Sequence, residues 1–171
     1  MKLRKIKRNK RGSIIDIGFL LIAILGLALF ILIVGYVFPQ ITSQVKTSEI
    51  GTNADSVKAL DSSDNIILRF DGIFLAIYIG IAISVLITSF FIDSSPILIP
   101  VYIIGLGIMI IFAVVAENVY ENFAENGTLL AVAASHTITN YIMSHLILIT
   151  IGLGVLSMIL IFAKPNRGGP Y

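Results

Sequence analysis

Four long stretches without a charged residue dominate this sequence: residues 17–45, 72–92, 94–116 and 126–163. A charge at the centre of a bilayer costs at least about 2.5–3.5 kcal/mol, and a helix needs roughly 20 apolar residues to cross a ~30 Å hydrocarbon core. None of the stretches has a polar face. Charged residues make up only 13% of the chain, against about a quarter in soluble domains. We therefore predict an all-α integral membrane protein and exclude a water-soluble enzyme.

These stretches predict four transmembrane helices, at residues 14–38, 72–92, 97–117 and 141–163. Pro39 should end the first helix, because proline lacks the N–H that a helix interior needs. Residues 93–96 (Asp-Ser-Ser-Pro) are short enough to join the second and third helices as a tight hairpin. The remaining segments are a basic tail at 1–13, an outer polar loop at 39–71, an outer acidic and interfacial segment at 118–140, and a C-terminal tail at 164–171. The polar loop could hold a short surface helix around residues 56–60, and residues 128–140 suit a short helix or re-entrant piece at the outer interface.

Basic residues are concentrated at the two ends of the chain. The ends and the turn at 93–96 carry nine basic and two acidic residues, whereas the rest of the chain carries three basic and eight acidic residues. Basic residues favour the cytoplasmic side of a membrane. Both termini are therefore expected inside, and the segments 39–71 and 118–140 outside.

The basic tail admits two interpretations. It holds the first helix in its orientation, and it also suits attraction to a polyanion: anionic lipid, at about 1 kcal/mol per basic residue, or nucleic acid through counterion release. Arg11-Gly12, followed by Asp16, resembles the cleavage junction of type IV prepilins, and the alternative is an uncleaved signal-anchor helix. The basic residues of the tail are Lys2, Arg4, Lys5, Lys7, Arg8, Lys10 and Arg11.

The second predicted helix carries small residues at every fourth position. This spacing places them on one face of the helix. In lipid, close approach of backbones through small residues is a main source of attraction between helices. We expect this face to pack against another helix, either within the chain or in a neighbouring copy. The residues are Gly72, Ala76, Gly80, Ser84 and Thr88.

Three glutamates and the two histidines form the one candidate metal cluster. Glu117, Glu121 and Glu125 share a helical face, and with His136 and His145 they offer oxygen and nitrogen ligands. The spacing resembles half of a di-metal bundle motif, but the Glu-x-x-His element of that motif is missing. A solvated acidic face explains the pattern more simply, so no metal and no other cofactor is expected.

Motifs for catalysis are missing from the sequence. It contains no cysteine, no Gly-rich phosphate loop, no H-E-x-x-H and no G-x-S-x-G, and Ser135 beside His136 is the wrong geometry for a nucleophile and its base. A non-enzymatic protein is expected.

Asn126-Gly127-Thr128 matches the N-glycosylation pattern on the predicted outer side, which makes Asn126 a candidate modification site.

Residues 70–164 carry a family resemblance. The turn at Asp93–Pro96, the Asn- and Glu-rich segment after the third helix and the stretch Thr139–Leu146 are similar to small multi-span membrane proteins of phages and archaeal viruses. The resemblance implies a minor virion membrane protein, with its basic end toward the packaged genome and its acidic segments toward capsid protein.

The function expected from these features is that of a structural or assembly component of a membrane. Its partners would be the lipid bilayer and other membrane or capsid proteins, including further copies of the chain, with nucleic acid at the basic tail. Two alternatives remain: an accessory subunit of a cellular membrane complex, and a small pore former of the holin or channel type.

Overall fold

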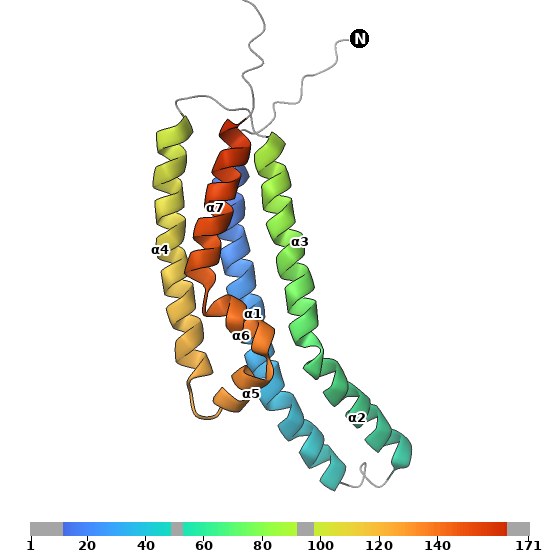
Figure 1. Ribbon diagram of the computed structural model, residues 1–171. Coiled ribbons are helices and arrows are strands. Elements are labelled where there is room, and N and C mark those ends of the chain that lie inside the picture. The colour runs from blue at the N-terminus through green and yellow to red at the C-terminus, as the bar shows by residue number, and fades with distance from the viewer. Residues whose placement is uncertain (1–11, 49–52, 92–97, 164–171) are drawn as a thin grey trace, which may run out of the picture.

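The computed structural model describes residues 12–48, 53–91 and 98–163, and these residues form helices and turns without a strand (Figure 1). The basic residues at 2–11 and the turn at 93–96 lie outside the described residues. The helices are α1 Gly12–Thr47, α2 Ala54–Leu68, α3 Phe70–Phe91, α4 Leu98–Ala124, α5 Leu130–Ser135, α6 Thr137–Met143 and α7 Leu146–Phe162.

The long helices α1, α3, α4 and α7 form a four-helix bundle (Figure 1). Each packs against two neighbours, in the circular order α1, α4, α7, α3. α1 and α4 run in one direction, whereas α3 and α7 run in the other, so the start of α1 and the end of α7 lie at the same end of the bundle. The short helices α5 and α6 lie across the bundle toward its opposite end.

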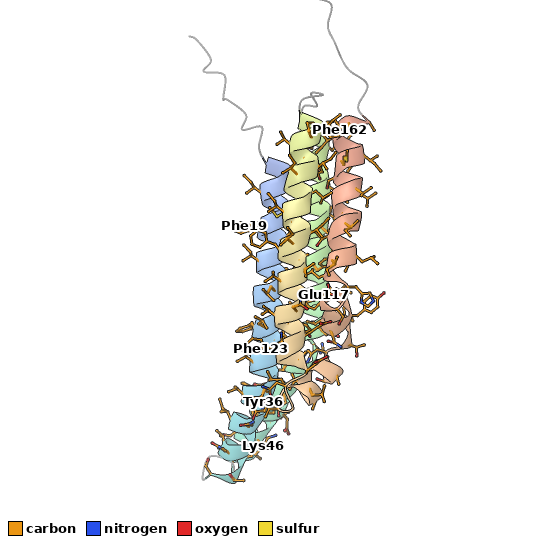
Figure 2. The ribbon with its side chains drawn as sticks, turned by 90° about the vertical axis from the view of Figure 1, so that its left-hand side faces the viewer. Phe19, Tyr36, Lys46, Glu117, Phe123 and Phe162 are labelled. Atoms are coloured by element: carbon orange, nitrogen blue, oxygen red, sulfur yellow. The ribbon has the colours of Figure 1, made fainter. Side chains whose placement is uncertain are left out.

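The core of the bundle is apolar, and so is much of its outer surface. Buried residues on α1, such as Ile17, Ile24 and Ile31, recur at helical spacing and form one wall of the core. Large apolar side chains also point outward along the bundle (Figure 2), and Phe19 is 75% exposed. A water-soluble protein does not carry so large an exposed apolar surface. The arrangement is compatible with a bundle surrounded by lipid.

Three helical stretches are long and apolar enough to cross a membrane: Ile15–Thr47, Ala54–Phe91 and Ile99–Ala124. A fourth crossing is present if α6 and α7 are counted together, although they are bent by 67° at their junction. α7 alone has 17 residues, which correspond to about 25 Å of helix. The described chain therefore has three or four candidate spans and is compatible with an integral membrane protein.

The expected helix end at Pro39 is wrong, because α1 continues through this residue to Thr47. Proline removes only one N–H from the hydrogen-bond ladder of the helix. The hydroxyl of Thr42 lies within hydrogen-bonding distance of the carbonyl oxygens of Phe38 (3.2 Å) and Pro39 (3.0 Å). Contacts between this extension and α2 hold it in place, so the helix survives the proline.

The polar segment 39–71 is mainly helical where it is described: it contains the end of α1 and the whole of α2. The short surface helix expected around residues 56–60 lies within this longer α2. Asn53 caps α2, since its side chain accepts a hydrogen bond from the N–H of Asp55 (2.9 Å), and such a cap is worth about 1 kcal/mol. Lys46 on α1 lies 2.7 Å from a carboxylate oxygen of Asp61 on α2. The Ser- and Asp-rich composition suggested a loop, but these local caps and pairs support a helix that packs on the end of α1.

The predicted tight hairpin between the second and third spans is not confirmed. α3 and α4 lie diagonally across the bundle, separated by α1 and α7, and are not packed neighbours. Six residues separate Phe91 from Leu98, and six extended residues reach about 20 Å. The diagonal of a bundle with 8–10 Å between neighbours is about 11–14 Å. Six residues are therefore long enough to join helices on the diagonal. A short connection in the sequence does not require that the two helices it joins pack against each other.

Candidate functional site

The most distinctive feature of the fold is a broken helix in its C-terminal third. The segment predicted as one span at 141–163 is interrupted at Ser144 and His145, and a second break at His136 separates α5 from α6. Each helix start exposes backbone N–H groups that lack a partner within the helix. In an apolar environment such groups need partners elsewhere in the molecule.

Asp71, in the first turn of α3, supplies these partners for α6. Its Oδ2 accepts a hydrogen bond from the N–H of Ile138 (2.8 Å), and its Oδ1 accepts from the N–H and the hydroxyl of Thr139 (both 2.7 Å). A carboxylate at a helix N-terminus gains from charge-assisted hydrogen bonds and from the helix dipole. Asp71 therefore ties the start of α6 to α3, across more than sixty residues of sequence.

Glu117 on α4 does the same for α7. Its Oε2 accepts a hydrogen bond from the N–H of Ile147 at 3.0 Å, next to the second break. Two carboxylates from two long helices thus hold the starts of α6 and α7. Because these carboxylates are engaged by backbone N–H groups, the arrangement is suited to fixing the broken helix in place and not to presenting a free acid for catalysis.

His136 fills the first break and is only 2% exposed. Its Nδ1 lies 3.0 Å from the carbonyl oxygen of Val132 and 3.1 Å from the hydroxyl of Ser135, and its Nε2 lies 3.4 Å from the carbonyl oxygen of Ile67. α1 passes close beside it at Gly35, where an added Cβ would lie 3.3 Å from His136 Cε1. The imidazole is therefore a packed, hydrogen-bonded core group at the junction of three helices.

Tyr120 on α4 completes the polar region. It is fully buried, and its hydroxyl has no hydrogen-bond partner among the described residues. Buried polar groups are normally paired, which makes this hydroxyl the one clear exception in the described part of the site.

The candidate metal cluster is not assembled. Among the described residues, no three or more His, Asp or Glu side chains are placed to share a metal ion. Glu117 is engaged at the start of α7, Glu125 is exposed beyond α4, and His145 stacks on the ring of Tyr141 at 4.3 Å between centroids. The shared helical spacing of the glutamates does not bring them into a common site with the histidines.

The small-residue face of α3 points away from the bundle. Gly72, Ala76, Gly80 and Ser84 are exposed, and added Cβ atoms at Gly72 and Gly80 would meet no atom within 4 Å. The opposite face of α3 packs inward through its buried residues. Among the described residues no helix therefore covers this part of the face, and its packing against a neighbouring molecule stays a prediction. Thr88, the fifth member, is partly buried and donates to the carbonyl oxygen of Ser84 (2.8 Å).

Close packing between α4 and α7 depends on Gly154. An added Cβ there would lie 3.0 Å from Leu106 Cδ2 and still closer to Cδ1. The hydroxyl of Tyr102 also donates to the carbonyl oxygen of Gly154 at 3.1 Å. By contrast, Gly107 and Gly152 face open space. Gly154 differs from Gly107 and Gly152 only in its contact with a neighbouring helix. This difference cannot be read from the sequence.

Asn126 lies in the exposed turn after α4. Its Oδ1 accepts hydrogen bonds from the hydroxyl of Thr128 (3.0 Å) and from its N–H (3.3 Å). Glycosylation of Asn126 stays a prediction.

Sequence reasoning did not identify Asp71, Thr139 or Tyr120 as members of a site. The one available signal was the position of Asp71, a single aspartate directly before the apolar run 72–92.

Comparison with protein-family models, curated proteins and solved structures finds no match for this chain.

Proposed function

We propose that this chain is a non-enzymatic structural component of a membrane assembly, in which copies pack laterally through the small-residue face of α3. The observation that supports the proposal is the exposure of Gly72, Ala76, Gly80 and Ser84 along one outward line of a long apolar helix. In lipid, apolar side chains alone give little preference for a protein neighbour over an acyl chain. A line of small residues allows the backbones of two helices to approach closely, and an acyl chain does not provide an equivalent contact.

The rest of the fold supports a static role. The polar atoms of the broken helix are engaged largely by other parts of the same chain: Asp71 holds α6, Glu117 holds α7, and His136 contacts backbone carbonyls. The core between the long helices is filled with apolar side chains. These features favour a rigid bundle that presents an outer surface, and they disfavour a pore through a single chain.

Lateral packing is tested by the matched variants Gly80→Leu and Gly107→Leu. Both glycines lie on long helices, are exposed and face open space, so neither leucine disturbs the fold of the single chain. Energy transfer between donor- and acceptor-labelled chains in lipid vesicles, measured against protein dilution, reports association. We expect Gly80→Leu to abolish transfer and Gly107→Leu to retain it. Equal transfer in both variants would refute the role of the α3 face.

For the identity of the assembly, we propose the membrane of a virus particle. The support is the resemblance of residues 70–164 to small viral membrane proteins and the division between basic ends and an acidic remainder. The test is a density gradient of the native source, with the chain located by mass spectrometry. Banding with capsid protein and nucleic acid is expected. Banding with cell membrane and one large partner would instead identify an accessory subunit, and dye leakage from cells on expression would favour the pore former.

A further inference from the structure

The turn between α4 and α5 contains the one asparagine in the sequence that precedes a glycine. Asn126, Gly127 and Thr128 are all exposed. α4 has 27 residues, or about 40 Å of helix, which exceeds a ~30 Å hydrocarbon core. The glutamates of α4 lie near this end, and charge is costly in the core. The excess length therefore carries the turn beyond the hydrocarbon, where water reaches it.

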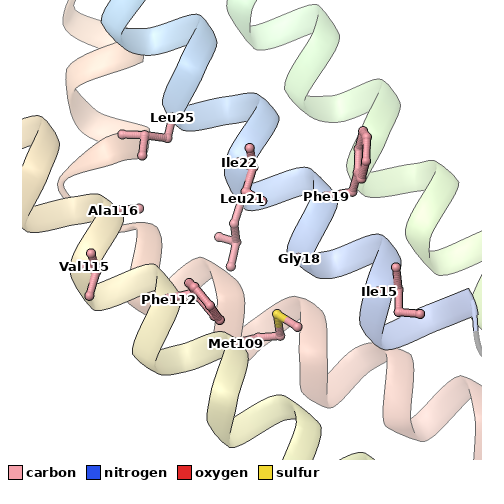
Figure 3. Close-up of a pocket in the computed structure, with 10 residues that line it drawn as sticks. All are labelled: Ile15, Gly18, Phe19, Leu21, Ile22, Leu25, Met109, Phe112, Val115 and Ala116. Carbon is pink, nitrogen blue, oxygen red and sulfur yellow. The ribbon is translucent and has the colours of Figure 1, made fainter.

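The backbone nitrogen of Gly127 is available as a nucleophile. Among the described residues its N–H donates no hydrogen bond, whereas the N–H groups of Asn126 and Thr128 each donate one. A Cβ at Gly127 would meet no atom within 4 Å, whereas one at Gly18, in the apolar groove between α1 and α4 (Figure 3), would lie 3.1 Å from Met109 Sδ. The space around Gly127 therefore admits the movement that a reaction at its nitrogen requires.

The side-chain amide of Asn126 is positioned and polarised for attack by this nitrogen. Its Oδ1 accepts hydrogen bonds from the hydroxyl of Thr128 (3.0 Å) and from its N–H (3.3 Å). The second bond closes an Asx turn, a ring that contains the Gly127 nitrogen and folds Cγ over that peptide unit. Both donors also stabilise the negative charge that develops on Oδ1 when a nucleophile adds to Cγ. The same two contacts therefore orient the amide and activate it.

We propose that Asn126 is a site of spontaneous deamidation, with water as the co-reactant. The Gly127 nitrogen loses its proton to water and forms a bond to Asn126 Cγ. The Cγ–Nδ2 bond then breaks, and Nδ2 takes up a proton and leaves as ammonia. Water opens the resulting succinimide at Cγ, which gives aspartate, or at the main-chain carbonyl carbon of Asn126, which gives isoaspartate. No group is oxidised or reduced.

Deamidation changes both the charge and the backbone of the turn. It adds a carboxylate next to Glu125. It also removes Nδ2, the atom to which a glycan would be attached, so deamidation and glycosylation of Asn126 exclude each other. The main-chain carbonyl oxygen of Asn126 accepts hydrogen bonds from the N–H groups of Leu129 (2.8 Å) and Leu130 (2.9 Å). In isoaspartate this carbonyl belongs to the free carboxylate, so the start of α5 loses its fixed acceptor.

Asn53 is a matched control within the same chain. It is exposed, and its side chain accepts a hydrogen bond from the N–H of Asp55 (2.9 Å), as in the turn at Asn126. It precedes Ala54 and not a glycine, and no hydroxyl donates to its side chain among the described residues. Asn53 therefore has the same type of turn without the unhindered nitrogen and without the second donor.

The test uses the full chain, expressed in a host without N-glycosylation, purified in detergent and incubated at neutral and at mildly alkaline pH. Peptide mass spectrometry follows the conversion of each asparagine, and isoaspartyl methyltransferase detects isoaspartate. We expect Asn126 to be converted, faster at the higher pH because the attacking nitrogen must lose its proton, while Asn53 stays intact. Equal conversion of the two residues would overturn the proposal.

Two variants separate the contributions of the turn. Thr128→Val removes the hydroxyl donor and keeps the N–H, and it should slow conversion about two- to tenfold, the range that one hydrogen bond supplies. Gly127→Ala adds a Cβ beside the nucleophile without a clash in the folded turn, and it should lower the rate to that of Asn53. An unchanged rate in Thr128→Val would refute activation by the hydroxyl, and an unchanged rate in Gly127→Ala would refute attack by an unhindered nitrogen. The proposed packing of α3 does not enter this reaction, so either proposal stands without the other.

Discussion

Replacement of Gly154 by alanine tests the close contact between α4 and α7. The new Cβ would lie 3.0 Å from Leu106 Cδ2 and 3.2 Å from its Cγ, both closer than ordinary van der Waals contact. Either Leu106 leaves its position or the two helices separate, which also weakens the hydrogen bond from Tyr102. Overpacking of this kind costs about 1–3 kcal/mol.

Gly152→Ala is the control, because it lies on the same helix and faces open space. Both variants gain the same helix propensity over glycine, up to about 1 kcal/mol, so this gain cancels in their comparison. We therefore expect Gly154→Ala to be about 1–3 kcal/mol less stable than Gly152→Ala. Unfolding by SDS in mixed micelles, followed by circular dichroism, measures the difference. Equal stability would refute the close approach of α4 and α7 at this point.

Three further substitutions test the broken helix. Asp71→Asn removes the charge from three hydrogen bonds and should destabilise the protein by about 1.5–3 kcal/mol, with faster hydrogen exchange in the first turn of α6; unchanged exchange would contradict the capping role. Glu117→Ala should accelerate exchange of the Ile147 amide, which loses its acceptor, while the amides of α6 stay protected. Gly35→Ala should lower the unfolding free energy by about 1–3 kcal/mol relative to Gly26→Ala, because only the first Cβ meets neighbouring side chains; equal values would disprove that packing.

The helical class and the approximate positions of the long apolar helices could be predicted from charge alone. The second predicted span at 72–92 lies close to α3 at Phe70–Phe91, because charged residues bound the apolar run on both sides. The end of the first span could not be predicted in this way. Pro39 is a strong local signal, but contacts with α2 override it.

The broken helix and the order of the bundle depend on contacts between distant residues. His136 and Ser144 lie inside one charge-free run, and nothing local marks them as breaks. The breaks are stable because Asp71 and Glu117, which belong to other helices, satisfy the exposed N–H groups. In the same way, the small residues of α3 indicate a packing face, but only the position of the neighbouring helices decides that the face points outward.

Cysteine cross-linking in membranes tests most directly whether the α3 face joins two copies. The chain contains no cysteine, so the single-cysteine variants Gly80→Cys and Gly107→Cys each offer one defined thiol. Across a symmetric contact, equivalent positions near the centre meet each other, and a disulfide needs Cα atoms within about 7 Å. After oxidation, we expect a disulfide-linked dimer for Gly80→Cys and a monomer for Gly107→Cys. A monomer for both variants, or equal cross-linking of both, would contradict the account.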